Sequence, residues 1–357
     1  TKDFLKEHPY MMVDTRFFEE EFRFELLQLI DGLEDEIDGT LINSENYQGL
    51  SLIKDKYSEK IKCVYIDPPY NTGSDDNFEY KDNYRHSSWL TMMLNRITVS
   101  KKLLAEDGAY FISIDDREKA RLRILGDFIF QNNFLANFVR KRRASSAMSN
   151  NMISQDHEYI LAYGGKSLDS FRGLEKEFSN YSNPDNDPRG EWVAGDLTVG
   201  MTAEQRPNQF YDLVNPKTGK VYKPDPNRVW VYYPETMKEK IEEERIIFPE
   251  DTTQRPKYKR FKNELSILRN PISTWITTKK QDENDFFNVM KAGLNSEATR
   301  SIQSQFINNV FNYAKPTSLI QSLVKQTAYS NDFVLDYFAG SGTTGHAVLN
   351  LNKEDEG

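Results

Sequence analysis

The apolar positions between residues 40 and 130 alternate between two spacings. Short apolar runs at residues 40–43, 61–66 and 109–114 have the length and the β-branched and aromatic content of strands. The segments that follow the first two runs carry apolar residues at the spacing of one helical face. A strand, a helix and a second strand in succession form the unit of a parallel sheet. We therefore expect an α/β core in which the strands 40–43 and 61–66 are parallel neighbours.

The rest of the chain divides into segments with different patterns. Residues 14–30 place phenylalanine and leucine at helical spacing, and we expect this helix to dock its apolar face on the core. Two more apolar runs, 134–139 and 157–163, predict strands at an antiparallel edge. After Gly165 the alternation gives way to short aromatic runs separated by proline, asparagine and glycine, which predicts a separate strand-rich domain. We therefore expect a helical arm at 1–38, two halves of an α/β domain at 39–170 and 306–357, and an inserted domain at 171–305.

The strand at 61–66 ends abruptly in Asp67, Pro68, Pro69 and Tyr70. Two consecutive prolines cannot continue a ladder, so the aspartate and the tyrosine ring lie on a stiff turn at the carboxyl end of a strand, where open α/β sheets bind ligands. The exocyclic amine of a nucleobase is a poor nucleophile, because its lone pair is delocalised into the ring. The Asp67 carboxylate and the Pro68 carbonyl can each accept one of its N–H groups, and Tyr70 offers a face on which an extruded base can stack. Taken alone, the four residues also fit an ordinary turn at the end of a strand.

A second stretch, near the C-terminal end, also follows an apolar run. Gly340, Gly342 and Gly345 match G-x-G-x-x-G before a helix, a pattern typical of dinucleotide-dependent dehydrogenases. Asp336 and Phe338 before the glycines, and the hydroxyl residues among them, instead suit adenosine attached to a cationic sulfonium amino acid. In that interpretation the glycines let the backbone approach, Phe338 packs against the cofactor and the Asp336 carboxylate favours its positive end. The loop alone leaves both cofactors open.

Composition narrows the class of protein. The single cysteine, Cys63 inside the 61–66 strand, fits a reducing cytoplasm and leaves no loop cysteine for methylation of a cytosine ring carbon. No apolar run is long enough for a membrane span, and the four histidines lack the spacing of metal ligands, so we expect neither a membrane nor a metal. With a net charge of −9, the chain would have to meet a nucleic acid through local basic patches. The candidate phosphate contacts are Arg140, Lys141, Arg142 and Arg143 in one run, and Arg255, Lys257, Lys259 and Arg260 in another.

Together these stretches resemble one family, the beta class of S-adenosylmethionine-dependent DNA amino-methyltransferases, in which the catalytic turn precedes the cofactor loop. Within that class the chain looks most like the modification subunit of Type III restriction–modification systems. The resemblance implies a Rossmann-like class I methyltransferase sheet, circularly permuted, with a target-recognition domain inserted at 171–305. The stretches that carry it are 41–50, 64–73, 80–90, 108–116, 315–320 and 336–344.

The resemblance also implies roles for individual residues. The residues 67–70 would form the catalytic turn. The polar loop at 71–82, read from its own residues, is expected to be a lid that brings Phe78 or Tyr80 over the flipped base. Glu45 would touch the adenosine of the cofactor, although from the sequence alone its carboxylate equally fits the N-cap of the helix that follows. Lys315 and Pro316 would line the methionine end of the cofactor. The remaining cofactor contacts would be Asp67, Asp336, Phe338, Gly340, Gly342 and Thr343.

The expected activity is methyl transfer to adenine N6 in double-stranded DNA after base extrusion, because such enzymes usually carry aspartate at the position of Asp67 when they act on adenine. Methylation of cytosine N4 and a non-catalytic DNA-binding subunit are the alternatives. Family members act as homodimers and pair with a separate helicase–nuclease restriction subunit. The chain begins without methionine and ends at Gly357, before the strand whose acidic residue binds the cofactor ribose in this fold, so we expect it to be a fragment.

Overall fold

The chain folds into two compact units, Thr1–Arg172 with Ser273–Gly357, and Gly173–Ile272. Each unit has its own core, and the two are described separately. Among the described residues, no helix has both the length and the apolar character needed to cross a bilayer. The computed structural model describes residues 2–8, 14–32, 37–73, 80–131, 133–146, 152–168, 170–278, 289–306 and 311–355.

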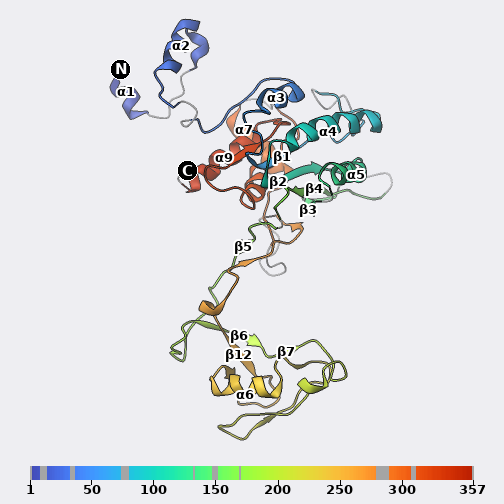
Figure 1. The fold of residues 1–357 in the computed structure, drawn as a ribbon, viewed down its shortest axis with the longest axis vertical. Helices are drawn as coiled ribbons and strands as arrows, with labels where there is room; N and C mark the ends of the chain where they lie inside the picture. The colour runs from blue at the N-terminus through green and yellow to red at the C-terminus, as the bar shows by residue number, and fades with distance from the viewer. Residues whose placement is uncertain are drawn as a thin grey trace. The chain divides into compact units, whose positions relative to one another are not determined.

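A six-stranded mixed sheet forms the core of the first unit (Figure 1). In the order in which they lie side by side, its strands are β14 (Trp275–Ile276), β3 (Phe134–Lys141), β4 (His157–Gly164), β2 (Leu104–Ile114), β1 (Ile61–Ile66) and β15 (Phe333–Leu335). Strand β1 is parallel to both of its neighbours, β2 and β15. Strand β4 is antiparallel to β2 and β3. The carboxyl ends of β1 and β15 therefore meet at one edge of the sheet, although the last residue of β1, Ile66, and the first residue of β15, Phe333, are 267 positions apart in the sequence.

Helices connect these strands and cover the sheet. Helix α4 (His86–Lys101) and helix α5 (Lys119–Ile129) bury Trp89, Met93 and Leu122 in one apolar cluster with Tyr110 of β2. This burial of large side chains provides most of the free energy that holds the helices on the sheet. The other helices of this unit are α1 (Lys2–Glu7), α2 (Glu20–Gln28), α3 (Asn46–Ile53), α7 (Asn295–Gln305), α8 (Thr317–Val324) and α9 (Thr343–Asp355), with a 3-10 turn at Thr15–Phe17.

Residues 40–43 do not form the strand that their apolar pattern predicts. They belong to no strand or helix, and Leu41 is 88% exposed. The place beside β1 that we expected them to fill is occupied by β15, a strand from the far end of the sequence. The prediction is wrong because β15 pairs with this edge of β1, and a local apolar pattern does not decide which segment pairs there.

The prediction that the N-terminal helix docks its apolar face on the core is also wrong. Helix α2 is shorter than the predicted 14–30 segment, and none of its residues is buried. Phe24 is 58% exposed and Leu29, which caps the helix, is 81% exposed. Helical periodicity identifies an apolar face but not the surface that covers it.

The two predicted antiparallel strands are confirmed as β3 and β4. They do not form the edge of the sheet, because β14 pairs in parallel with β3 outside them. Strand β14 and helix α7 come after the second unit in the sequence but belong to the first. The inserted unit therefore ends at Ile272, well before the expected boundary at 305, while its observed start at Gly173 lies two residues after the expected one.

The second unit contains short strands around a small apolar core. Leu197, Tyr222, Trp230 and Met237 are buried in that core, where the helix α6 (Pro234–Glu242) supplies Met237. Its largest sheet has the order β11-β12-β6, and all of its pairings are antiparallel. The strands are β5 (Leu174–Glu175), β6 (Trp192–Asp196), β7 (Thr198–Val199), β8 (Leu213–Val214), β9 (Val221–Tyr222), β10 (Val229–Trp230), β11 (Ile246–Ile247), β12 (Lys257–Phe261) and β13 (Arg269–Asn270).

Candidate active site

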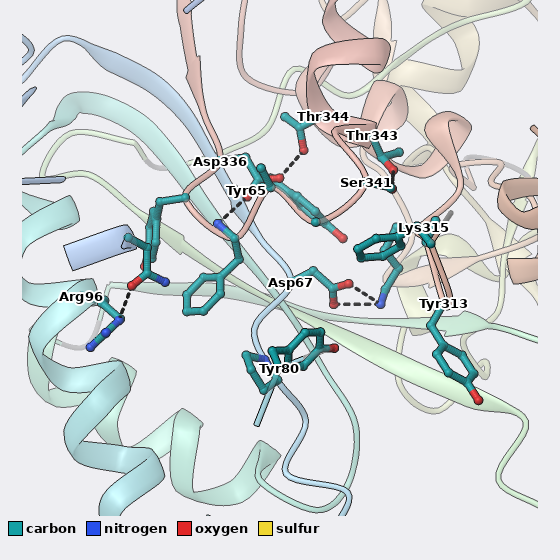
Figure 2. A pocket seen from close by; sticks show the side chains of 18 of the residues that line it. Tyr65, Asp67, Tyr80, Arg96, Tyr313, Lys315, Asp336, Ser341, Thr343 and Thr344 are labelled. Atoms are coloured by element: carbon teal, nitrogen blue, oxygen red, sulfur yellow. Dashed lines mark hydrogen bonds and ion pairs between the residues drawn. The ribbon is translucent and has the colours of Figure 1, made fainter. Parts of the chain in front are cut away.

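A pocket of about 450 Å³ opens where β1 and β15 end (Figure 2). Asp67 lines it from the turn after β1, and Asp336, Phe338 and Gly340 line it from the loop after β15. The structure thus brings together the two stretches that the sequence singled out. Pockets of this size at the carboxyl ends of parallel strands are the usual ligand sites of open α/β sheets.

Hydrogen bonds hold the turn that carries Asp67. The indole nitrogen of Trp89 donates to the Pro69 carbonyl at 2.8 Å. Asp82, which is 1% exposed, accepts from the backbone N–H groups of Asn71 at 2.8 Å and Thr72 at 3.0 Å. Pro68 and Pro69 fix two φ angles in addition, so the turn is rigid before any substrate binds.

Asn71 directs the chain out of this turn. Its φ of 59° lies in the left-handed region, where asparagine is tolerated better than most residues. Its side-chain oxygen accepts from the Tyr84 N–H at 2.7 Å, and its amide nitrogen donates to the buried Glu118 at 2.6 Å. The supporting roles of Asp82, Trp89 and Glu118 could not be predicted from the sequence, because they depend on contacts between distant segments.

Asp67 is paired with Lys315, which precedes α8. The lysine Nζ donates to the two carboxylate oxygens at 2.8 and 2.7 Å, as the dashed lines in Figure 2 show. Burial raises the pKa of Asp67, and the neighbouring ammonium of Lys315 opposes that rise. The same Nζ lies 4.8 Å from the centre of the Tyr70 ring, a cation–π contact. Tyr70 and the buried Pro68 belong to the turn, but among the described residues they do not line the pocket.

The loop after β15 supplies a second carboxylate. Asp336 accepts from the Phe338 N–H at 2.9 Å and from the Thr344 hydroxyl at 2.6 Å. Burial raises the pKa of Asp336 to about 7. Gly340 and Gly342 have φ of 54° and 74°, and a Cβ on Gly340 would come within 3.2 Å of the Phe311 ring, so both positions favour glycine.

The remaining predicted cofactor residues divide into two groups. Glu45, Lys315 and Thr343 line the pocket. Glu45 also caps α3, accepting from Tyr47 N at 2.9 Å, and forms an ion pair with Arg96. It thus reaches the expected place without the predicted strand before it. Pro316 and Gly342 lie in the adjoining backbone and are not among the described lining residues.

The first basic run does not lie entirely on the surface. Arg140 is 1% exposed and forms an ion pair with Glu158, its cross-strand neighbour in β4. Its predicted role as a phosphate contact is therefore wrong for this structure, because a buried, paired guanidinium cannot reach a phosphate. Lys141, Arg142 and Arg143 are partly exposed and remain candidates.

In the second basic run, exposed and buried side chains alternate, as they do along a strand. Arg255, Lys257 and Arg260 are exposed. Lys259, in contrast, is 8% exposed and forms ion pairs with Asp185 and Asp187, so its assignment as a phosphate contact is also corrected. In the first unit, Tyr80 is 46% exposed and lines the pocket. Phe78 lies outside the described residues.

The sequence of this chain is similar to that of known DNA methylases. A sequence profile of the DNA methylase family, which covers N6 and N4 methylases, matches residues 61–354. The chain belongs to this family. Membership of the DNA methylase family excludes the dehydrogenase that the glycine loop left open.

Individual relatives agree with the family assignment. The Type III restriction-modification enzyme StyLTI Mod subunit of Salmonella typhimurium is 30% identical over 349 residues, which cover 88% of this chain and 50% of that protein. The Type II methyltransferase M.KpnI of Klebsiella pneumoniae is 32% identical over 328 residues, covering 87% of this chain and 75% of that protein. This DNA methylase chain thus spans half the length of the StyLTI subunit. Among solved structures, M1.HpyAVI matches with a TM-score of 0.38 and 14% identity, covering 87% of this chain and 86% of that one.

Proposed function

We propose that this protein transfers a methyl group from S-adenosylmethionine to adenine N6 in double-stranded DNA. One observation supports the proposal above all: Asp67 after β1 and the glycine loop after β15 line the same pocket. The first stretch has the acceptors that an exocyclic amine needs, and the second has the features of a nucleoside cofactor site. Family membership gives the two stretches a common reaction.

The amine side of the reaction depends on the rigid turn. The Asp67 carboxylate and the Pro68 carbonyl accept the two N–H groups, which makes the nitrogen more tetrahedral and directs its lone pair towards the methyl donor. The base reaches the pocket only after extrusion from the duplex, and stacking on an aromatic ring compensates for the lost stacking. Tyr70 in the turn and Tyr80 at the pocket are the rings that this step would use.

The cofactor residues fit the group. The left-handed glycines at 340 and 342 carry no side chain, so a ligand can approach the backbone at these two positions. Phe338 offers an apolar surface, and the Asp336 carboxylate favours a positive charge. When bound, S-adenosylmethionine supplies an electrophilic methyl group, and the pocket residues orient it and exclude water.

Adenine is the proposed base because aspartate occupies position 67, the form usual in adenine-specific members of the family. The names of several relatives, which are Type III Mod subunits, support a place in a restriction–modification system. On that basis we also propose a homodimer and a separate restriction subunit as partners. The exposed Arg255, Lys257 and Arg260 of the inserted unit, and residues 141–143, are the proposed DNA contacts.

The proposal is tested by sequencing single DNA molecules from methylation-deficient cells that express the intact gene. We expect N6-methyladenine at one recurrent sequence motif and none in cells that express the Asp67→Ala variant. N4-methylcytosine at a recurrent motif would reassign the base and keep the chemistry. The absence of any new modified base, with normal amounts of folded protein, would contradict the proposal.

A further inference from the structure

A lysine connects the catalytic turn to a buried carboxylate on another strand. Besides its two bonds to Asp67, the Lys315 Nζ lies 3.9 Å from Glu158 Oε2 on β4. The Glu158 side chain is 1% exposed and that of Lys315 is 9% exposed. An ammonium in this position interacts with two carboxylates in a region that water scarcely enters, so its location is fixed by charge as well as by packing.

Arg140 anchors the far end of this connection. Its Nη1 donates to Glu158 Oε1, and its Nη2 donates to the Gly293 carbonyl at 2.9 Å and to Asn295 Oδ1 at 2.8 Å. The acceptors belong to strand β4, a loop and the start of α7, so Arg140 is held by three segments and in turn binds Glu158. The four side chains carry two positive and two negative charges, so the buried group is neutral as a whole.

We propose that Glu158 is a positioning residue for methyl transfer: it holds the ammonium of Lys315 across Asp67, and Arg140 holds Glu158. The inference rests on the proposed function and goes beyond it. It also reassigns Lys315, which the family resemblance placed at the methionine end of the cofactor, to the catalytic carboxylate. Glu158 touches neither substrate nor cofactor in this account and acts only through Lys315.

The reason lies in the charge that Asp67 must keep. A carboxylate can accept an N–H of the amine only from an oxygen that carries no proton, and burial favours the protonated form. The ammonium of Lys315 lowers the pKa of Asp67, whereas the negative charge of Glu158 raises it. The two partners therefore have opposite electrostatic effects on Asp67, even though they act together mechanically.

Other charged or titratable groups also face Asp67. Tyr65 lies on β1, Tyr70 in the same turn and Tyr80 in the loop that follows. The pKa of each is raised mainly by burial and, in addition, by the Asp67 charge. The Asp67 charge also contributes to the raised pKa of Asp336, which follows β15. Among the described groups that shift the pKa of Asp67 most, Lys315 is the cation and Glu158 the anion, so these two positions provide the sharpest test.

The experiment measures the pH dependence of single-turnover methylation for the wild type, Glu158→Gln and Lys315→Gln, with saturating cofactor. We expect the acid limb of the profile to move upwards by about 1–3 pH units in Lys315→Gln, the size of a lost opposite charge. In Glu158→Gln the limb should move downwards, by less than about one unit, while the plateau rate falls because the lysine is no longer held. Glu106→Gln, at an exposed carboxylate that pairs with Lys166, is the matched control and should keep the wild-type profile.

A second variant protects the test against misfolding. Glu158→Gln leaves an amide that can still accept from Arg140, but if that protein is unstable, the double variant Glu158→Gln/Arg140→Gln removes both buried charges at once. Replacing a whole buried pair with neutral groups is tolerated better than breaking it. The double variant should show the same downward direction of the acid limb. Thermal melting confirms that each measured protein is folded.

Two results would overturn the inference. One is a pH profile in which the acid limb of both folded Glu158 variants stays at the wild-type pH. The other is a raised KM for the cofactor in Lys315→Gln with an unchanged plateau rate and pH profile, which would return the lysine to the cofactor. A wild-type protein that methylates no duplex argues against the proposed function itself, so the two failures are distinguishable.

Discussion

The aspartates that follow β1 and β15 look alike in the sequence, but different groups surround their carboxylates in the structure. Both strands end in an aspartate that lines the same pocket. Asp67 receives an ammonium, from Lys315. Asp336 receives an N–H group and a hydroxyl, which are neutral donors, and its pKa rises to about 7. The ammonium of Lys315 thus favours the ionised form of Asp67 and opposes the effect of burial, whereas a positively charged ligand would do the same for Asp336.

This difference matches the two proposed tasks. An acceptor for an amine must be ready before the base enters, since pre-organisation is what lowers the barrier. A carboxylate for a sulfonium cofactor can be charged by the cofactor itself, because the cation stabilises the ionised form. The two aspartates should therefore have separate effects on methyl transfer and on cofactor binding.

The largest effect is expected at Asp67. In Asp67→Ala the amine loses its charged acceptor, and the single-turnover rate should fall by about 10³-fold or more, comparable with the loss of a pre-organised polar group in other enzymes. Cofactor affinity, measured by calorimetry, should stay within a few-fold. Asp67→Ala with near wild-type turnover would show that this end is not catalytic. A parallel loss of cofactor binding would show that the two ends do not act separately.

The next effect is expected at Asp336, on binding. For the wild type, affinity for S-adenosylmethionine should increase as the pH rises through about 7, because the carboxylate ionises there and attracts the cation. Asp336→Asn should weaken binding by about tenfold at pH 8, equivalent to about 1.4 kcal/mol, and abolish most of the pH dependence. Titrations at pH 6, 7 and 8 measure both. The comparison fails if the variant keeps the wild-type pH dependence.

Stability should change in the opposite direction with pH. The pKa of Asp336 is about 7 in the folded protein and has an ordinary value of 3.8, so between these values the folded state holds a proton that the unfolded chain has lost. The free energy of unfolding should therefore fall as the pH rises from about 4 to about 7. Urea midpoints for the wild type, Asp336→Asn and the control Glu106→Gln measure this. The decrease of the unfolding free energy with pH should become smaller in Asp336→Asn alone. Some decrease should remain in that variant, because the pKa of Asp67 is also raised.

The smallest effect is expected when one hydrogen bond that holds the turn after β1 is removed. Thr72 donates its hydroxyl to the buried Asp82, and Thr72→Val removes that bond with little change in shape. We expect a loss of about 1 kcal/mol in the free energy of unfolding. The methylation rate should fall by less than about tenfold, and cofactor affinity should not change, because the β15 end is untouched. A loss of cofactor affinity instead would indicate that the turn also shapes the loop.

The same two ends show what the sequence could reveal. The double proline after 61–66 and the glycines after 333–335 are local signals, because each residue restricts its own backbone. Both stretches line the pocket, and their catalytic and cofactor roles stay predictions. That the halves meet in one pocket followed from the family resemblance, and the pairing of β1 with β15 confirms it.

Features that depend on pairing between distant segments were not predictable. The run at 40–43 reads as a strand, but β15 takes the position beside β1. Arg140 reads as a surface cation in a basic run, and only the register of β3 against β4 places it opposite Glu158. Lys259 alternates with exposed basic neighbours and faces two aspartates. Charges that become buried pairs resemble surface charges until the register of the strands is known.

The most direct test of the account is a structure of the protein with a methylatable duplex and S-adenosylhomocysteine. The account predicts an extruded adenine whose N6 lies within about 3.2 Å of both the Asp67 carboxylate and the Pro68 carbonyl, a hydrogen-bonding distance, with the nucleoside of the cofactor on the loop at Gly340. An extruded base whose amine contacts other groups, or a cofactor bound away from that loop, would contradict it.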